Sequence, residues 1–263
     1  WTGKVKYRIK IITLITLIII PIVFDHLIPN SPFTVDTSKK FMEISSKYLL
    51  GTDNLGRCEL SRLLFAGKIT VGLVVMASFI IGIIGTILGL LLSINDSLFK
   101  TILLSIMDSI TAIPTIVYLV IIVGILDNRV VTVIIALVLS IVLRLTKFVM
   151  VLSQEEQQKA YCICAKCLGA SNYRIVFIHI LPNIIYRVLS YLSLSCAEMI
   201  MMISGFSFIG INLGDTKIDW GFMLNEGRKY FNIMPSLTIY PMILIILYSF
   251  VFNTLSNVIK EKK

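Results

Sequence analysis

Six long apolar stretches constrain this chain more than any other feature. They lie at residues 11–27, 69–93, 101–126, 130–151, 184–206 and 235–257. A helix needs about 17 to 25 mostly apolar residues to cross the hydrocarbon layer of a bilayer. Hydrophobic residues make up 57% of the chain and charged residues 15%, which is more apolar than a soluble domain of 263 residues needs. The sequence therefore predicts an all-α, polytopic membrane protein with six transmembrane helices.

Basic residues predict how these helices are oriented. They cluster before the first stretch and after the last: Lys4, Lys6, Arg8, Lys10, Lys260, Lys262 and Lys263. Because cytoplasmic flanks carry an excess of Lys and Arg, we expect a multi-pass protein of the cell membrane with both termini cytoplasmic. With six crossings, segment 144–187 falls inside, and segments 28–68 and 207–234 fall outside. The net charge of +9 then reflects this bias and contact with anionic membrane lipid, and no nucleic-acid partner is expected.

A polar and basic interruption separates the fourth and fifth stretches. Residues 161–183 read YCICAKCLGASNYRIVFIHILPN, which predicts a small-residue helix, a turn at Gly169 and a second short helix. On the cytoplasmic side, such a segment presents a surface to a soluble partner. We expect a coupling-helix segment over residues 155–182.

Three cysteines in this segment, Cys162, Cys164 and Cys167, form a C-x-C-x-x-C cluster. In a helix, Cys164 and Cys167 share a face while Cys162 points elsewhere, and no fourth ligand of matching spacing follows. The cluster is therefore interpreted as small residues in a packed helix, and no metal site is predicted.

Catalytic signatures are missing from the sequence. It contains no G-x-x-x-x-G-K-[ST] phosphate loop, no H-E-x-x-H and no G-x-S-x-G, and its two histidines, His26 and His179, lie far apart. We expect a non-catalytic protein with no cofactor of its own.

Ionisable residues inside membrane helices are costly and suggest function. Asp108 and Glu198 are the candidates for a translocation path. Asp108 could equally be a helix-end residue paired with a cation. Met202 is a third candidate, against the alternative that it fills space in an apolar helix. A glycine stripe at Gly82, Gly85 and Gly89 predicts close packing against a neighbouring helix.

Four sequence blocks resemble a known family. They are LGTDNLGRCELSRLLFAG at 50–67, CAKCLGAS at 164–171 followed by HILPN, FSFIGI at 206–211, and DWGFMLNEGRKYF at 219–231. In this order and spacing, they resemble the second, shorter transmembrane permease of ATP-binding-cassette (ABC) importers of the peptide and nickel class. In the family's E-A-A-x-x-x-G loop, Ile163 here stands at the acidic position and Cys164 at the first alanine.

The resemblance implies a partner set and a division of the chain. A second permease, two ATP-binding subunits and an extracellular substrate-binding protein are implied, and ATP and Mg would be bound by the partner subunits. The divisions are a transmembrane helix and external segment at 1–68, a permease domain at 69–257 and a cytoplasmic tail at 258–263. The residues implied to couple to the ATPase are Ala165, Lys166, Leu168, Gly169, Ala170 and Ser171.

The implied cargo is a peptide, or nickel or another transition metal, possibly chelated. One rival is an ion-coupled secondary transporter, but no repeated halves are visible and segment 155–182 would have no purpose in it. A membrane-embedded enzyme is a second rival, but it would need clustered catalytic residues, which the sequence lacks.

The external segment contains one further expected element. Residues 215–231 are amphipathic enough for a short interfacial helix. The apolar side chains expected toward the membrane are Trp220, Phe222, Met223 and Tyr230, and the polar ones expected toward water are Asp219, Glu226 and Arg228.

Overall fold

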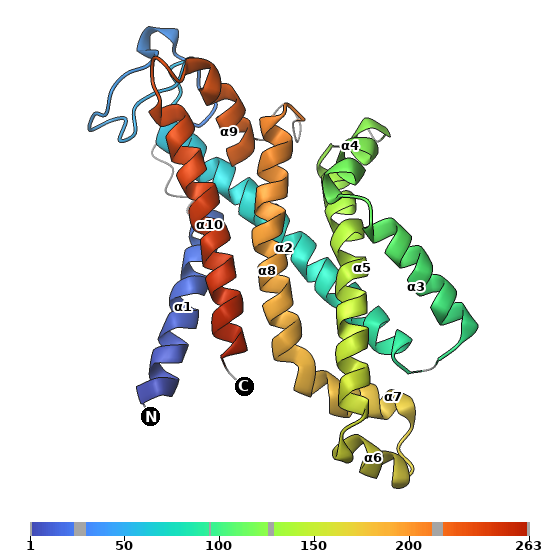
Figure 1. Cartoon of the computed structure of the whole chain (residues 1–263). Coiled ribbons are helices and arrows are strands. Elements are labelled where there is room, and N and C mark those ends of the chain that lie inside the picture. The colour runs from blue at the N-terminus through green and yellow to red at the C-terminus, as the bar shows by residue number, and fades with distance from the viewer. Residues whose placement is uncertain (1, 24–29, 95, 126–128, 212–217, 262–263) are drawn as a thin grey trace. The chain divides into compact units, whose positions relative to one another are not determined.

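The computed structural model describes residues 2–23, 30–94, 96–125, 129–211 and 218–261. Over these ranges the regular structure is helical, with one isolated β-bridge between Thr52 and Cys58. The predicted all-α class is therefore confirmed (Figure 1).

The helices follow one another in this order: α1 (Thr2–Val23), η2 (Thr37–Lys39), α2 (Glu59–Leu92), α3 (Leu98–Thr111), α4 (Thr115–Ile125), α5 (Arg129–Gln157), α6 (Ala160–Cys167), α7 (Asn172–Arg174), η3 (Ile175–Ile180), α8 (Leu181–Phe208), α9 (Trp220–Gly227), η4 (Arg228–Tyr230) and α10 (Ser236–Lys260). η3 is a π-helical turn, whereas η2 and η4 are 3₁₀ turns.

Four helical runs in the described residues are long and apolar enough to cross a membrane. They are Glu59–Leu92, Val130–Gln157, Asn172–Phe208 and Ser236–Lys260. The first predicted span corresponds to α1, whose described apolar part is the shorter run Lys10–Val23. The chain is thus an integral membrane protein.

The third predicted span is two helices rather than one. Residues 101–126 were expected to form a single helix, but α3 ends at Thr111 and α4 begins at Thr115. Pro114 explains the break, because proline lacks an N–H group and disfavours helical backbone in the residue before it. The number of apolar residues in the stretch does not reveal such a break in the helix.

The chain divides into two compact units. Unit 1 comprises Trp1–Val75 and Cys196–Leu255, and unit 2 comprises Met76–Ser195 and Ser256–Lys263.

Unit 1 is organised around Trp220, which is 1% exposed. Its Nε1 donates a hydrogen bond to the Leu63 carbonyl oxygen at 3.0 Å. Its ring lies so close to α2 that a Cβ added to Gly67 would be 2.8 Å from a ring carbon. The Tyr248 ring, 5.0 Å away between centroids, links this core to α1, because its hydroxyl donates to the Leu17 carbonyl oxygen at 2.9 Å.

In unit 2, α5 contacts α3, α4, α6 and η3. The predicted role of the glycine stripe is confirmed here. A Cβ on Gly85 would lie 2.8 Å from the Leu145 side chain, and one on Gly89 would lie 2.5 Å from the Thr146 carbonyl oxygen. The two glycines therefore let α2 and α5 approach more closely than larger residues would permit.

Candidate functional site

The tip, defined as residues 160–174, comprises α6, a turn and α7. α6 ends in a Schellman motif, in which the Gly169 N–H donates to the Lys166 carbonyl oxygen at 2.9 Å and the Ala170 N–H to the Ala165 carbonyl oxygen at 3.0 Å. Gly169 has φ +83°, a left-handed conformation that glycine adopts without strain. The chain turns sharply at the predicted position.

Ser171 then starts the next helix. Its hydroxyl oxygen accepts a hydrogen bond from the Arg174 N–H at 3.3 Å, which is the usual N-cap arrangement. The helical path continues through η3 into α8.

The tip exposes large apolar side chains. Leu168 is 88% exposed, Tyr173 60% and Ile163 51%. A Cβ on Gly169 would meet no atom within 4 Å, so the turn itself is open to approach. Exposed apolar surface of this kind typically marks a site that binds another protein or a membrane.

A buried carboxylate fixes the base of the tip. The Glu156 side chain, 3% exposed, accepts hydrogen bonds from Lys159 Nζ at 2.6 Å, from the Tyr161 hydroxyl at 2.8 Å and from Arg187 Nη2 at 3.3 Å. Glu155 adds an ion pair to Arg187 at 3.5 Å. Burial and the hydrogen bond to the Glu156 carboxylate raise the pKa of Tyr161 well above its usual range. The end of α5, the start of α6 and the first turns of α8 are thereby linked.

Sequence reasoning missed Glu156 as a functional residue. In the sequence it is one of two adjacent acidic residues, Glu155 and Glu156, and its partner Arg187 lies 31 residues further along the chain.

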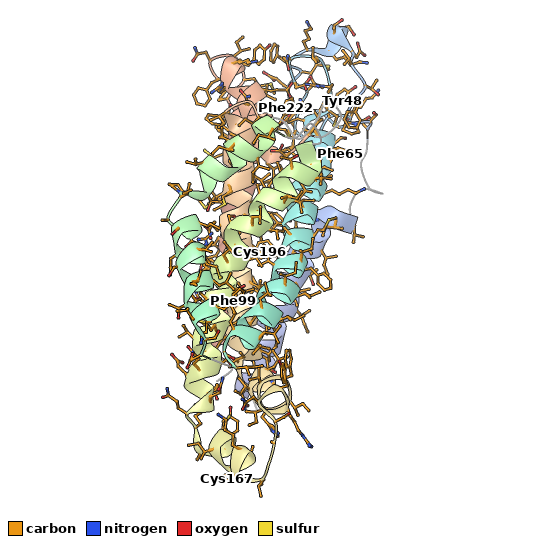
Figure 2. The ribbon with its side chains drawn as sticks, turned by 90° about the vertical axis from the view of Figure 1, so that its right-hand side faces the viewer. Tyr48, Phe65, Phe99, Cys167, Cys196 and Phe222 are labelled. Carbon is orange, nitrogen blue, oxygen red and sulfur yellow. The ribbon has the colours of Figure 1, made fainter. Side chains whose placement is uncertain are left out.

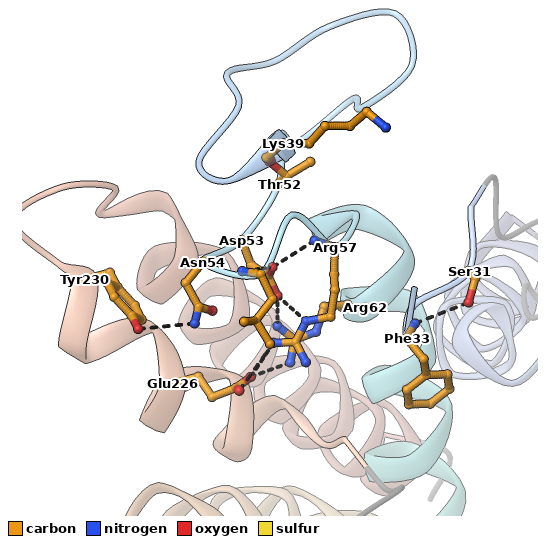
Figure 3. A network of polar contacts seen from close by, with 11 residues as sticks. Ser31, Phe33, Lys39, Thr52, Asp53, Asn54, Arg57, Arg62, Glu226 and Tyr230 are labelled. Carbon is orange, nitrogen blue, oxygen red and sulfur yellow. Dashed lines mark hydrogen bonds and ion pairs between the residues drawn. The ribbon is translucent and has the colours of Figure 1, made fainter. Parts of the chain in front are cut away.

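An arginine cluster in unit 1 joins two of the blocks that carried the resemblance (Figure 3). It comprises Asp53, Arg57, Arg62 and Glu226. Arg57 Nε lies 2.6 Å from Asp53 Oδ2, and Arg57 Nη2 lies 3.3 Å from Glu226 Oε1. Arg62, whose side chain is 2% exposed, pairs with both carboxylates. The segment before α2 is therefore held against α9.

The faces of the 215–231 helix were predicted incorrectly for three residues. Trp220 and Met223 do not face the membrane, because they are 1% and 3% exposed and lie in the protein core. Residues 215–217 lie outside the described residues, and the helix is α9, from Trp220 to Gly227. Asp219 does not face water: it is fully buried and caps α9, accepting hydrogen bonds from the Gly221 N–H at 2.8 Å and the Ser207 hydroxyl at 2.6 Å. Burial raises the pKa of Asp219 to about 6. The hydrogen bonds that Asp219 accepts as the N-cap offset the cost of burying its carboxyl group, so the start of α9 can lie inside the protein.

Comparison with protein families then identifies the class of the chain. Residues 81–261 match the family described as binding-protein-dependent transport system inner membrane component. The chain belongs to this family.

Curated relatives of this permease carry related names. The metal-staphylopine import system permease protein CntC of Staphylococcus aureus is 30% identical over 87% of this chain and 79% of its own length. The nickel transport system permease protein NikC of Escherichia coli is 23% identical over 99% and 94%. The glutathione transport system permease protein GsiD of Pectobacterium atrosepticum is 28% identical over 82% and 72%. The resemblance to permeases of the peptide and nickel class is confirmed.

A solved structure supports the fold of the permease. A chain of the MetNI methionine ABC transporter in inward facing conformations superimposes with a TM-score of 0.57 at 17% identity, covering 76% of this chain and 96% of that chain.

The candidate path residues of the permease lie in both units. In unit 2, Asp108 on α3 forms an ion pair with Lys147 on α5. In unit 1, Glu198 and Met202 are both half-buried and lie four residues apart on α8, and so on one face of that helix.

The cysteines of the permease separate into two environments. Cys162 is fully buried, as expected for a small packed residue, but Cys164 and Cys167 are exposed, and Figure 2 shows Cys167 at the end of the tip. The packed-residue interpretation is therefore wrong for these two, because α6 buries only one face. Among the described residues, no group of three or more His, Cys, Asp or Glu side chains is arranged to hold a metal ion.

Proposed function

We propose that this chain is the permease subunit of an ATP-driven importer and forms the translocation path together with a second permease. Its tip binds an ATP-hydrolysing subunit, and residues Ala165, Lys166, Leu168, Gly169, Ala170 and Ser171 make that contact. ATP and Mg are bound by two partner subunits, and this chain hydrolyses nothing.

One observation supports this proposal above the others: an exposed apolar tip stands on a rigid base. Leu168 is 88% exposed, whereas Glu156 near the end of α5 is 3% exposed and bonded to three side chains. An exposed apolar side chain gains free energy when a partner covers it. A rigid base means that movement of the partner is passed on to α5 and α8 rather than absorbed locally.

The translocation path in this proposal involves Asp108, Glu198 and Met202. The pairing of Asp108 with Lys147 reduces the cost of placing a carboxylate near the membrane. Alternating access then needs two helix packings with different affinities for cargo and nucleotide. The cargo is a peptide, or nickel or another transition metal, either free or chelated, delivered by an external binding protein; the named relatives support this range of cargo.

The test compares two exposed leucines of unit 2 in the co-purified complex. Leu168→Ser changes the tip, and Leu98→Ser changes a side chain at the start of α3 that is 79% exposed. We expect Leu168→Ser to lose binding-protein-stimulated ATP hydrolysis and uptake together, while Leu98→Ser retains both.

Two results would oppose the proposal. If the unmodified chain co-purifies with no ATPase, or if Leu168→Ser transports normally, the tip is not a coupling element. An ion-coupled secondary transporter would then be the better account.

A further inference from the structure

The helical run Asn172–Phe208 contains a change of hydrogen-bond pattern close to the tip. Residues Ile175–Ile180 form the π-helical turn η3, and the Leu181 N–H donates to the carbonyl oxygen of Val176, five residues back. An α-helix would use the residue four back. Such turns are rare and occur frequently at functional sites.

Pro182 accounts for this turn. Within an α-helix, its ring would collide with the carbonyl of Ile178, four residues earlier, and it has no N–H to donate. A wider turn moves that carbonyl away from the ring. The Asn183 side chain completes the arrangement, because its Nδ2 donates to the His179 carbonyl oxygen at 2.9 Å.

The π turn is packed on one side only. Ile175, Val176 and Ile180 are each at most 1% exposed, whereas Ile178 is 59% exposed. The turn contacts α5 and α6 as well as α7. The surrounding helices therefore hold it in one register, while its exposed side leaves room for a change in length.

The register of this turn decides where the tip points. Rewinding it as α-helix with the same number of residues would change the register between the tip and α8 by one residue, which corresponds to about 100° of rotation and about 1.5 Å of rise. Leu168 and Tyr173 would then present a different face to a partner.

We infer that the π turn Ile175–Ile180, set by Pro182, fixes the rotational position of the tip relative to α8. We call this turn the register joint of the tip, and we call that rotational position the phase of the tip. The inference rests on the proposed function, since phase matters only if the tip binds an ATPase. With the tip in its native phase, rotation or displacement of α8 reaches the partner through the tip. With the tip out of phase, its side chains no longer face the partner and the movement is not passed on.

Two variants of the full complex test this inference. Pro182→Ala restores the missing N–H and removes the ring, so η3 can rewind as α-helix with the tip out of phase. Pro182→Ala combined with deletion of Ile178 removes the extra residue of the wider turn and returns the tip to phase. Cryo-electron microscopy of each complex reads the backbone pattern at residues 175–181 directly.

We expect Pro182→Ala to show an α-helical pattern and to lose binding-protein-stimulated ATP hydrolysis. The double variant should also be α-helical but should regain stimulation. The inference is overturned if Pro182→Ala keeps the π turn, if it becomes α-helical with stimulation intact, or if the double variant stays uncoupled.

Failure of the proposed function looks different. If the tip of the unmodified complex makes no contact with an ATPase in the maps, the coupling proposal itself fails. If that contact is present and only the phase prediction fails, the register joint alone is refuted.

Discussion

At Gly169, the backbone strain caused by adding a methyl group can be measured without a steric clash. Its φ is +83°, and an added Cβ would meet no atom within 4 Å. Alanine there costs only the strain of left-handed backbone, about 1–2 kcal/mol. Gly124 in α4 also has open space around an added Cβ, but its helical backbone favours alanine by about 0.5–1 kcal/mol. The two substitutions should therefore act in opposite directions.

Hydrogen exchange of the purified complex measures this difference locally. In Gly169→Ala, the strain should open the Schellman motif, so that protection of the tip amides falls about 5- to 30-fold. Gly124→Ala should leave tip protection unchanged. Unchanged protection in Gly169→Ala would show that the turn is not held in the left-handed conformation, and an equal loss in Gly124→Ala would show that the effect is not local strain.

Three further predictions concern the base of the tip, the α9 cap and the helix packing. Glu156→Gln should destabilise the protein by about 1–3 kcal/mol in thermal unfolding, because one charged acceptor serves three donors. Glu155→Gln, at an acidic side chain 59% exposed, should have little effect; equal effects would contradict the assigned role. For Asp219, the pKa rises from 3.8 unfolded to about 6 folded, so its stabilising contribution is complete below about pH 4 and is lost as pH rises through 6. The stability gap between wild type and Asp219→Asn should therefore favour wild type by about 3 kcal/mol more at low pH than at pH 7, and a constant gap would refute this. Gly89→Ala should cost about 1–3 kcal/mol because its Cβ would lie 2.5 Å from a carbonyl oxygen of α5, whereas Gly72→Ala meets nothing within 4 Å and should not destabilise; similar melting temperatures for the two would oppose the packing account.

Local sequence signals predicted the parts of the molecule that depend on local physics. The turn at Gly169 and the helices around it follow from backbone preferences within a few residues. The glycine stripe of α2 likewise predicted close helix packing, since small residues have few other uses at that spacing.

Features that depend on distant partners could not be predicted in the same way. Glu156 became a central residue only because the fold places Arg187 beside it. Asp219 appeared to be a water-facing residue because its cap bonds and the Ser207 hydroxyl are visible only in three dimensions.

The two prolines show a further limit of reading apolar composition. Pro114 separates α3 from α4, while Pro182 is accommodated within a continuous helical run by a π turn. Proline ends a helix at Pro114, whereas at Pro182 the helix continues as a wider turn. At Pro182, the Asn183 side chain donates a hydrogen bond to a backbone carbonyl of the turn, and neighbouring helices pack against η3.

Site-specific photo-crosslinking can show whether the tip touches an ATP-hydrolysing subunit. A photoreactive amino acid replaces Leu168, the most exposed large apolar side chain of the tip, in the complete complex in membranes. In a control, it replaces Leu98. We expect irradiation to join the Leu168 position to an ATP-hydrolysing subunit, whereas the Leu98 position should form no such adduct. If the Leu168 position joins no ATPase, the tip does not couple this permease to ATP hydrolysis.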